Sequence, residues 1–170
     1  EKMIKNFIKN IILIIEDDKV LNIGISLKKK IYGKNIDQKQ LEKNLVEVKD
    51  IFKENYQDLI ILHMIIVEKE NDFSLNNANN NDDYQFLEVN FISIPNSFTF
   101  YFDKLLENYQ IKIERYMSGN YIKSYFDEDE IELSIMANKL KNGLNKNEVQ
   151  LVSKSIENRG FFEKFFQLFS

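Results

Sequence analysis

Apolar and polar positions divide the first part of the chain into short predicted elements. Residues 10–17 begin with a β-branched apolar run that is typical of a buried strand. The polar residues 17–19 predict a turn, and the apolar positions of 20–25 predict a second strand that forms a hairpin with the first. Residues 2–9 predict a short amphipathic helix or an extended lead-in, and 31–36 predict a short extended piece or a turn.

A regular helical pattern follows Asp37, which is a suitable N-cap residue. The apolar positions that recur at helical spacing are Leu41, Leu45, Val48, Ile51 and Phe52. Charged residues occupy the opposite face. The uncharged run 59–67 comes next, and its β-branched content favours a central strand that is covered on both faces.

The middle of the chain contains an asparagine-rich segment, 70–84, which predicts a solvated surface loop. Residues 86–94 largely alternate between apolar and polar and predict a strand. Ser97 is expected to cap a helix that runs through Gln110, and 111–116 predict another strand. The broad apolar face of this helix consists of Phe98, Phe100, Tyr101, Leu105, Leu106 and Tyr109.

The order strand, strand, helix, strand, loop, strand, helix, strand predicts an α+β fold with a mostly antiparallel sheet and helices on one face. We therefore expect an α+β domain over residues 1–126. Residues 127–170 are expected to form a helical extension. The apolar spacing predicts one helix that ends at Gly143 and another that begins near Val149 and runs toward Gly160.

The extension ends in a phenylalanine-rich tail, residues 161–169, whose pattern predicts an amphipathic helix. Its apolar face consists of Phe161, Phe162, Phe165, Phe166, Leu168 and Phe169. Burial of such side chains contributes about 1.5–3 kcal/mol each, so we expect this face to be covered. Three kinds of surface could cover this face: the chain's own sheet, a membrane surface, and a groove on a protein partner or second copy of the chain.

Composition excludes several classes of function. The absence of cysteine excludes disulfides, zinc–thiolate sites and thiol catalysis. A formal net charge of −4 argues against a nucleic-acid partner. The five glycines do not have the spacing of a phosphate-binding loop, so no nucleotide cofactor is expected. The apolar run 11–15 is too short to span a bilayer, and it lacks the small-residue cleavage site of a secretory signal.

No set of residues predicts catalysis, and we expect neither an enzyme nor a metal site. The single histidine, His63, lies in an apolar strand without a nearby acidic partner and is expected to be a structural residue. The acidic run 127–130 lacks the spacing of a calcium loop and suits the start of a helix. The spacing of the candidate acids does not single out a catalytic pair; these acids are Asp17, Asp18, Asp37 and Asp72.

The order of segments resembles a known family. Residues 58–72, DLIILHMIIVEKEND, are similar to the ILHxxPxxFxxD segment of the bacterial cell-division protein FtsA. Residues 87–94, LEVNFISI, resemble its LxVxxHxxT strand, and 97–117 resemble the NLxxCxxxAGLxVxxxV stretch that follows. Residues 34–41, KNIDQKQL, resemble its ReITxxDv helix entry.

The resemblance covers about residues 20–126 and corresponds to the inserted strand–helix–strand–strand (SHS2) subdomain of FtsA. It implies an interaction module for self-association and for recruiting later division proteins. The phenylalanine-rich tail resembles the membrane-targeting helix of FtsA, which implies a cytoplasmic adaptor at the inner face of the membrane. The alternative is a self-contained α+β binding or regulatory domain in which the tail is core or a dimer seam.

Three departures limit what the resemblance implies. Ile66 replaces the family's proline, and the asparagine-rich residues 76–83 replace its PxGMxG loop. The DxGT and DxGGGT phosphate loops are absent, so ATP binding is not implied.

Overall fold

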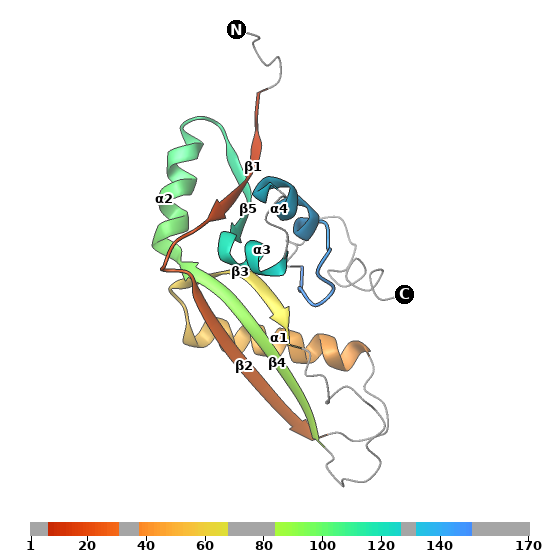
Figure 1. Ribbon diagram of the computed structural model, residues 1–170. Coiled ribbons are helices and arrows are strands. Elements are labelled where there is room, and N and C mark those ends of the chain that lie inside the picture. Colours follow the sequence, from red (N-terminus) through yellow and green to blue (C-terminus); the bar gives the residue numbers. More distant parts are fainter. Residues whose placement is uncertain (1–6, 31–37, 68–83, 127–131, 151–170) are drawn as a thin grey trace. The chain divides into compact units, whose positions relative to one another are not determined.

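The computed structural model describes residues 7–30, 38–67, 84–126 and 132–150. The elements in chain order are β1 (Asn10–Ile15), β2 (Leu21–Lys30), α1 (Gln38–Asn55), β3 (Leu59–Ile66), β4 (Tyr84–Pro95), α2 (Asn96–Glu107), β5 (Lys112–Ser118), α3 (Gly119–Tyr125) and α4 (Leu133–Lys141) (Figure 1). They form one antiparallel sheet of order β2-β4-β3 and one parallel pair, β1-β5. The predicted α+β fold class is confirmed.

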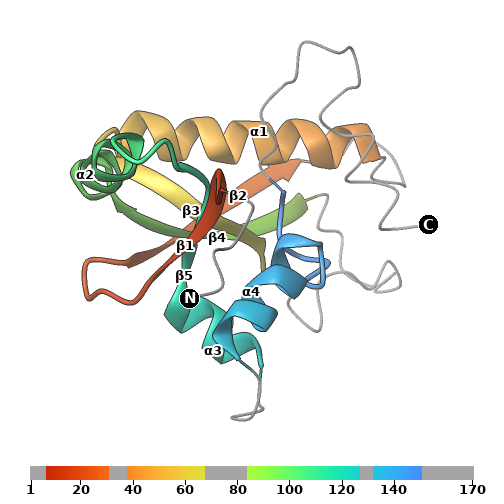
Figure 2. The ribbon, with the colours of Figure 1, turned by 90° about the horizontal axis from the view of Figure 1, so that it is seen from above.

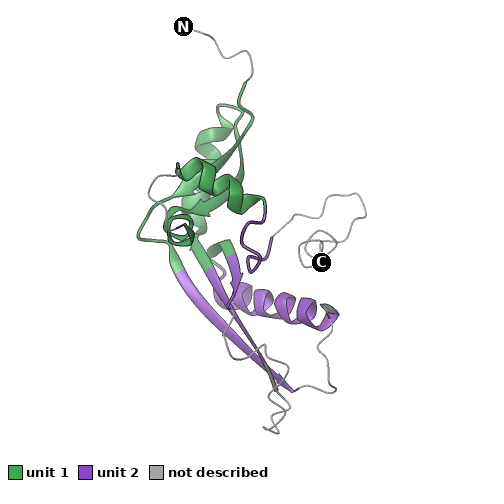
Figure 3. Cartoon of the chain, turned by 45° about the vertical axis from the view of Figure 1, so that its right-hand side comes forward, with its two compact units in different colours: residues 1–21, 58–63, 92–142 green, residues 22–57, 64–91, 143–170 purple. Residues whose placement is uncertain are grey.

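The chain divides into two compact units, which are coloured separately in Figure 3. Unit 1 comprises residues 1–21, 58–63 and 92–142, and unit 2 comprises residues 22–57, 64–91 and 143–170. The boundary between them crosses β3 and β4. The predicted division at residue 126 stays a prediction.

The hairpin predicted for the first two strands is wrong. The turn itself forms, since Val20 N donates to Asp17 O over 3.2 Å and Lys19 N donates to Asp17 Oδ1 over 2.8 Å. However, β1 pairs in parallel with β5, and β2 pairs with β4. Pairing between distant apolar strands therefore overrides the local turn. β1 is also less buried than predicted, because only Ile15 is fully buried.

The strand predicted to be central, β3, lies at one end of the sheet order, and β4 is the central strand. A later extended segment pairs with the outer edge of β3. Ile66 N donates to Asn147 O over 2.9 Å, and Val149 N donates to Met64 O over 2.8 Å. Because this segment is extended, the helix predicted from Val149 does not begin there.

The core of unit 2 lies between α1 and the sheet, with α1 running along one face of the strands (Figure 2). The predicted helix is confirmed, and Leu45, Val48 and Phe52 on its apolar face are buried. The ring of Phe52 stacks on that of Phe91, with a centroid separation of 4.6 Å. Alternate residues of β4 face this core, because Leu87 and Val89 are also buried.

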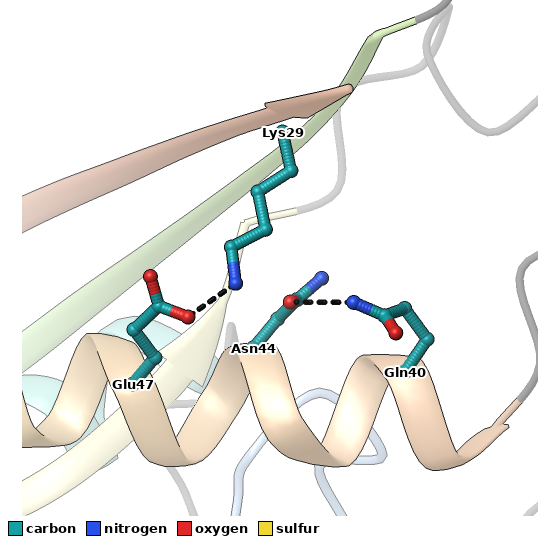
Figure 4. A network of polar contacts seen from close by, with 4 residues as sticks. All are labelled: Lys29, Gln40, Asn44 and Glu47. Atoms are coloured by element: carbon teal, nitrogen blue, oxygen red, sulfur yellow. Dashed lines mark hydrogen bonds and ion pairs between the residues drawn. The ribbon is translucent and has the colours of Figure 1, made fainter. Parts of the chain in front are cut away.

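Two polar contacts lie along α1, and one of them joins this helix to β2 (Figure 4). Lys29 forms an ion pair with Glu47, and Gln40 Nε2 donates to Oδ1 of the buried Asn44 over 3.3 Å. Lys29 is one of the positions of β2 that face the helix, since burial alternates along this strand.

The helix α2 differs from its prediction at both ends. Pro95 occupies the N-cap position, where Ser97 was expected, and Asn96 N donates to Asp58 O over 2.8 Å. The helix ends at Glu107, because the chain turns at Gln110, whose φ is 58°. Pro95 is the last residue of β4, and its ψ of 136° is extended, so the helix begins at the next residue, Asn96.

The last described helices form a short pair within unit 1. Helix α3 was not predicted; the side chain of Ser118 caps it by accepting from Tyr121 N over 3.3 Å. Helix α4 confirms the predicted helix, and Gly143 follows it with a φ of 87°, which suits glycine.

Other predicted features lie outside the described residues. They are most of the N-terminal lead-in, the piece at 31–36, the cap Asp37, most of the loop 70–84, the acidic run 127–130 and the phenylalanine-rich tail 161–169.

We expect Phe52→Ala to lower the free energy of unfolding by about 3–5 kcal/mol, because it leaves a cavity against Phe91. Urea denaturation followed by circular dichroism measures this loss. Lys53→Ala, at an exposed position of the same helix, is the control and should change stability by less than about 0.5 kcal/mol. Equal effects of the two substitutions would contradict the described core.

Candidate interaction surface

The inner side of α2 packs within unit 1 and holds the helix in place. Thr99 is buried, and Phe98, Phe102 and Leu106 are half-buried on the same side. The rings of Phe98 and Phe102 lie 5.0 Å apart. This side of the helix therefore has neighbours within the chain.

Tyr116 of β5 fixes the position of α2 further. Its hydroxyl lies 2.7 Å from Asp103 Oδ1 and 2.9 Å from the carbonyl oxygen of Thr99, so one proton is shared between two acceptors. Burial raises the pKa of Tyr116, and the hydrogen bond and charge of Asp103 raise it further. The neutral phenol is therefore the form that holds the helix.

The outer side of α2 exposes large apolar side chains. The exposed fractions are 59% for Phe100, 62% for Tyr101, 42% for Leu105 and 71% for Tyr109, which lies in the turn after the helix. Tyr101, Leu105 and Tyr109 follow one another at a spacing of four residues, so they share one stripe. We call Phe100, Tyr101, Leu105 and Tyr109 the α2 outer face.

The α2 outer face also carries a positive charge. The Nζ atom of Lys104 lies 4.3 Å from the ring centroid of Phe100, which is a cation–π contact. Within the described ranges, no carboxylate forms an ion pair with Lys104. Asp103, next to it, is hydrogen-bonded to Tyr116.

The sequence pattern identified the residues of the α2 outer face as apolar, but it did not predict that they are exposed. It assigned a single broad apolar face to this helix, whereas the structure buries one part of that face and exposes the other. The breadth of the face was the available indication, because a surface helix normally buries a narrower stripe against its core.

A groove of about 540 Å³ lies between β1 and α4 in the same unit. Its lining residues are Asn10, Ile11, Ile12, Ile14, Glu114, Ser134, Ile135, Ala137, Asn138 and Lys141. The lining is apolar along β1, and an ion pair between Lys141 Nζ and Glu114 Oε1, at 2.8 Å, forms part of it.

His63 has the structural role expected from the sequence. Its side chain is only 1% exposed, and Nε2 accepts a hydrogen bond from Ser118 N over 2.9 Å. The ring packs against that of Tyr121 at a centroid distance of 4.3 Å. An Nε2 that accepts carries no proton, so the arrangement uses a neutral imidazole to join β3 to the start of α3.

The backbone at Gly119, next to Ser118, lies close to the side chain of Glu16. A Cβ atom added to Gly119 would overlap the side chain of Glu16, so a larger residue would require this exposed side chain to move. Glu16 Oε1 in turn forms an ion pair with Lys123 Nζ at 2.6 Å. These contacts connect the end of β1 to α3.

The candidate acids do not assemble into a described site. Asp17 caps the turn, where the hydrogen bond from Lys19 N lowers its pKa. Asp18 lies in the same turn, whereas Asp37 and Asp72 lie outside the described residues. Across the described residues, no group of three or more His, Asp or Glu side chains is arranged to hold a metal ion.

The predicted contact residues of the tail cannot be placed against these surfaces, because they lie outside the described ranges. They are Phe161, Phe162, Phe165, Phe166 and Phe169. Among the helices that are described, none is long and apolar enough to cross a membrane.

Comparison with known proteins found no match, either to a protein-family model or to a curated protein. The resemblance to FtsA therefore stays a prediction. Exposed apolar side chains of unit 1 are therefore the features that indicate a function.

We expect the phenol of Tyr116 to ionise at a higher pH than the exposed tyrosines. Absorbance at alkaline pH, compared between the wild type and Tyr116→Phe, isolates its titration. Because the folded pKa is raised, the neutral phenol stabilises the fold below the ordinary tyrosine pKa of about 10, and this contribution is lost as pH rises through the folded pKa. Stability should therefore fall more steeply above about pH 10 in the wild type than in Tyr116→Phe. Equal slopes would contradict the described contact.

Proposed function

We propose that the protein is a non-enzymatic protein–protein interaction module that contacts its partner through the α2 outer face. The observation that carries this proposal is the exposure of Phe100, Tyr101 and Leu105 on a helix whose other side is packed, and of Tyr109 in the turn that follows. Isolated exposed apolar residues are common, but an exposed cluster on one element is typical of a contact surface.

The chemistry of these side chains suits an interface. Aromatic residues are enriched at the energetic centres of interfaces, and a tyrosine adds a hydroxyl that can pair with polar groups at the rim. Burial of each large side chain contributes about 1.5–3 kcal/mol before the costs of association. Since Tyr116 and the inner side of α2 already hold the helix, little ordering is required on binding.

The charge on the surface indicates what the partner offers. Lys104 lies within the apolar face and has no ion-pair partner in the described part of the chain. A partner with apolar side chains around one carboxylate would match both features. We therefore infer an apolar protein segment that carries an acidic residue.

The resemblance to FtsA extends this proposal to a role in cell division. The consecutive elements β2, α1, β3 and β4 have the order strand, helix, strand, strand, which supports comparison with the inserted subdomain of FtsA. In this proposal the protein is a cytoplasmic adaptor. Its phenylalanine-rich tail, 161–169, touches the inner face of the membrane.

A photo-crosslinking amino acid at position 101 tests the role of the α2 outer face. Introduced in place of Tyr101 in cells that make the protein, it should give a discrete adduct with one protein, identified by mass spectrometry. The same group in place of Lys53, an exposed residue of α1, is the control and should not give that adduct.

A second substitution distinguishes specific contact from random capture. Leu105→Glu places a charge on the exposed face without entering the core, so the chain should stay folded, but the adduct at position 101 should disappear. An adduct that survives Leu105→Glu, or no adduct at all, would contradict the proposed function.

Co-sedimentation with anionic liposomes tests the proposed tail. The wild type should pellet with the vesicles, whereas Phe162→Glu/Phe166→Glu should remain in solution while keeping its circular dichroism spectrum. Gln167→Glu/Ser170→Glu adds the same charge away from these phenylalanines and is the matched control. If the wild type does not pellet, or if the phenylalanine variant unfolds, the tail is not a membrane contact.

A further inference from the structure

The outer edge of β1 is a second surface of unit 1, separate from the α2 outer face. In the described ranges, β1 pairs with β5 alone, from Asn10 beside Lys112 to Ile15 beside Ser118. Parallel pairing is slightly weaker per residue than antiparallel pairing. A further strand on β1 would add backbone hydrogen bonds to this small sheet.

β1 lacks the residues that normally protect an edge. Natural edge strands usually carry lysine, proline or inward charges that prevent pairing with other chains. β1 has the sequence NIILII and contains none of these, whereas β2 ends in consecutive lysines, 28–30. Its single irregularity is a register shift toward β5 between Ile11 and Ile12.

Two exposed apolar residues precede the strand. Phe7 is 93% exposed and Ile8 is 61% exposed. The exposed Lys9 lies between them and β1, and its carbonyl oxygen accepts from Lys112 N. The groove of about 540 Å³ also borders this strand, and its lining includes Ile12 and Ile14 of β1, Glu114 of β5 and the half-exposed Ile135 of α4.

We propose that β1 pairs antiparallel with β1 of a second copy of this chain. The occupant of this edge must be extended, apolar and uncharged, and β1 itself has all three properties. An antiparallel pair of identical strands related by a two-fold axis is self-complementary, so each contact occurs twice. The product is a sheet of order β5-β1-β1′-β5′, in which Phe7 and Ile8 of each copy lie along the other copy.

Hydrogen exchange at different protein concentrations tests this pairing in the full chain. The amides of residues 11–15 that do not point toward β5 should exchange at least about tenfold more slowly at high than at low micromolar concentration. Amides at 22–28, on the edge strand β2, should not depend on concentration. Sedimentation velocity should show the mass double over the same range.

Charged substitutions at the two edges give a matched comparison. Asn10→Lys is at an exposed position of β1, so it should keep the fold and leave the chain monomeric, whereas Asn22→Lys on β2 should leave the dimer intact. A wild type that stays monomeric would overturn the inference, as would a dimer in which β1 exchange is unchanged. A monomer that still gives the position-101 adduct would leave the α2 proposal standing.

Discussion

The parallel pairing of β1 with β5 is the contact on which unit 1 depends. It joins residues near the beginning of the chain to residues more than a hundred positions later, and both strands belong to unit 1. Parallel strands need a long crossover, and here the crossover contains most of the described fold. Both candidate surfaces border this pair: α2 packs against β5, and the groove runs along β1.

Contacts at the carboxyl end of β5 connect this pairing to the rest of unit 1. His63 accepts from Ser118 N, and the side chain of Ser118 caps α3. The same strand carries Tyr116, whose hydroxyl holds α2 through Thr99 and Asp103. Because these groups are hydrogen-bonded, the outer side of α2 is presented on a helix of fixed position. A fixed helix loses little conformational entropy when a partner binds.

Local patterns predicted much of this fold. The apolar spacing predicted α1 and the face that carries the buried Val48 and Phe52. The order of strands and helices predicted the α+β class. Predictions that depend on pairing between strands far apart in the sequence were wrong. The turn after β1 forms without a hairpin, because β5 competes for β1, and β3 is an end strand whose outer edge is covered by a segment near Glu148.

The candidate surface could be predicted only in part. The residues of the α2 outer face were recognised as apolar, but which of them contact the chain depends on where β5 places the helix. The capping of α3 by Ser118 likewise depends on a strand end that sequence periodicity does not locate. His63 was easier to interpret, because an apolar strand without nearby acids favours a structural imidazole.

The central claim is that the α2 outer face is presented to a partner and does not support the fold of the isolated chain. The most direct test is the unfolding free energy of a variant with Tyr101→Ser, Leu105→Ser and Tyr109→Ser combined. If these side chains face solvent, stability should change by no more than about 0.5 kcal/mol for each substitution. A total loss of about 6 kcal/mol or more, which is about 2 kcal/mol for each buried side chain, would show that the chain itself covers this face and would contradict the claim.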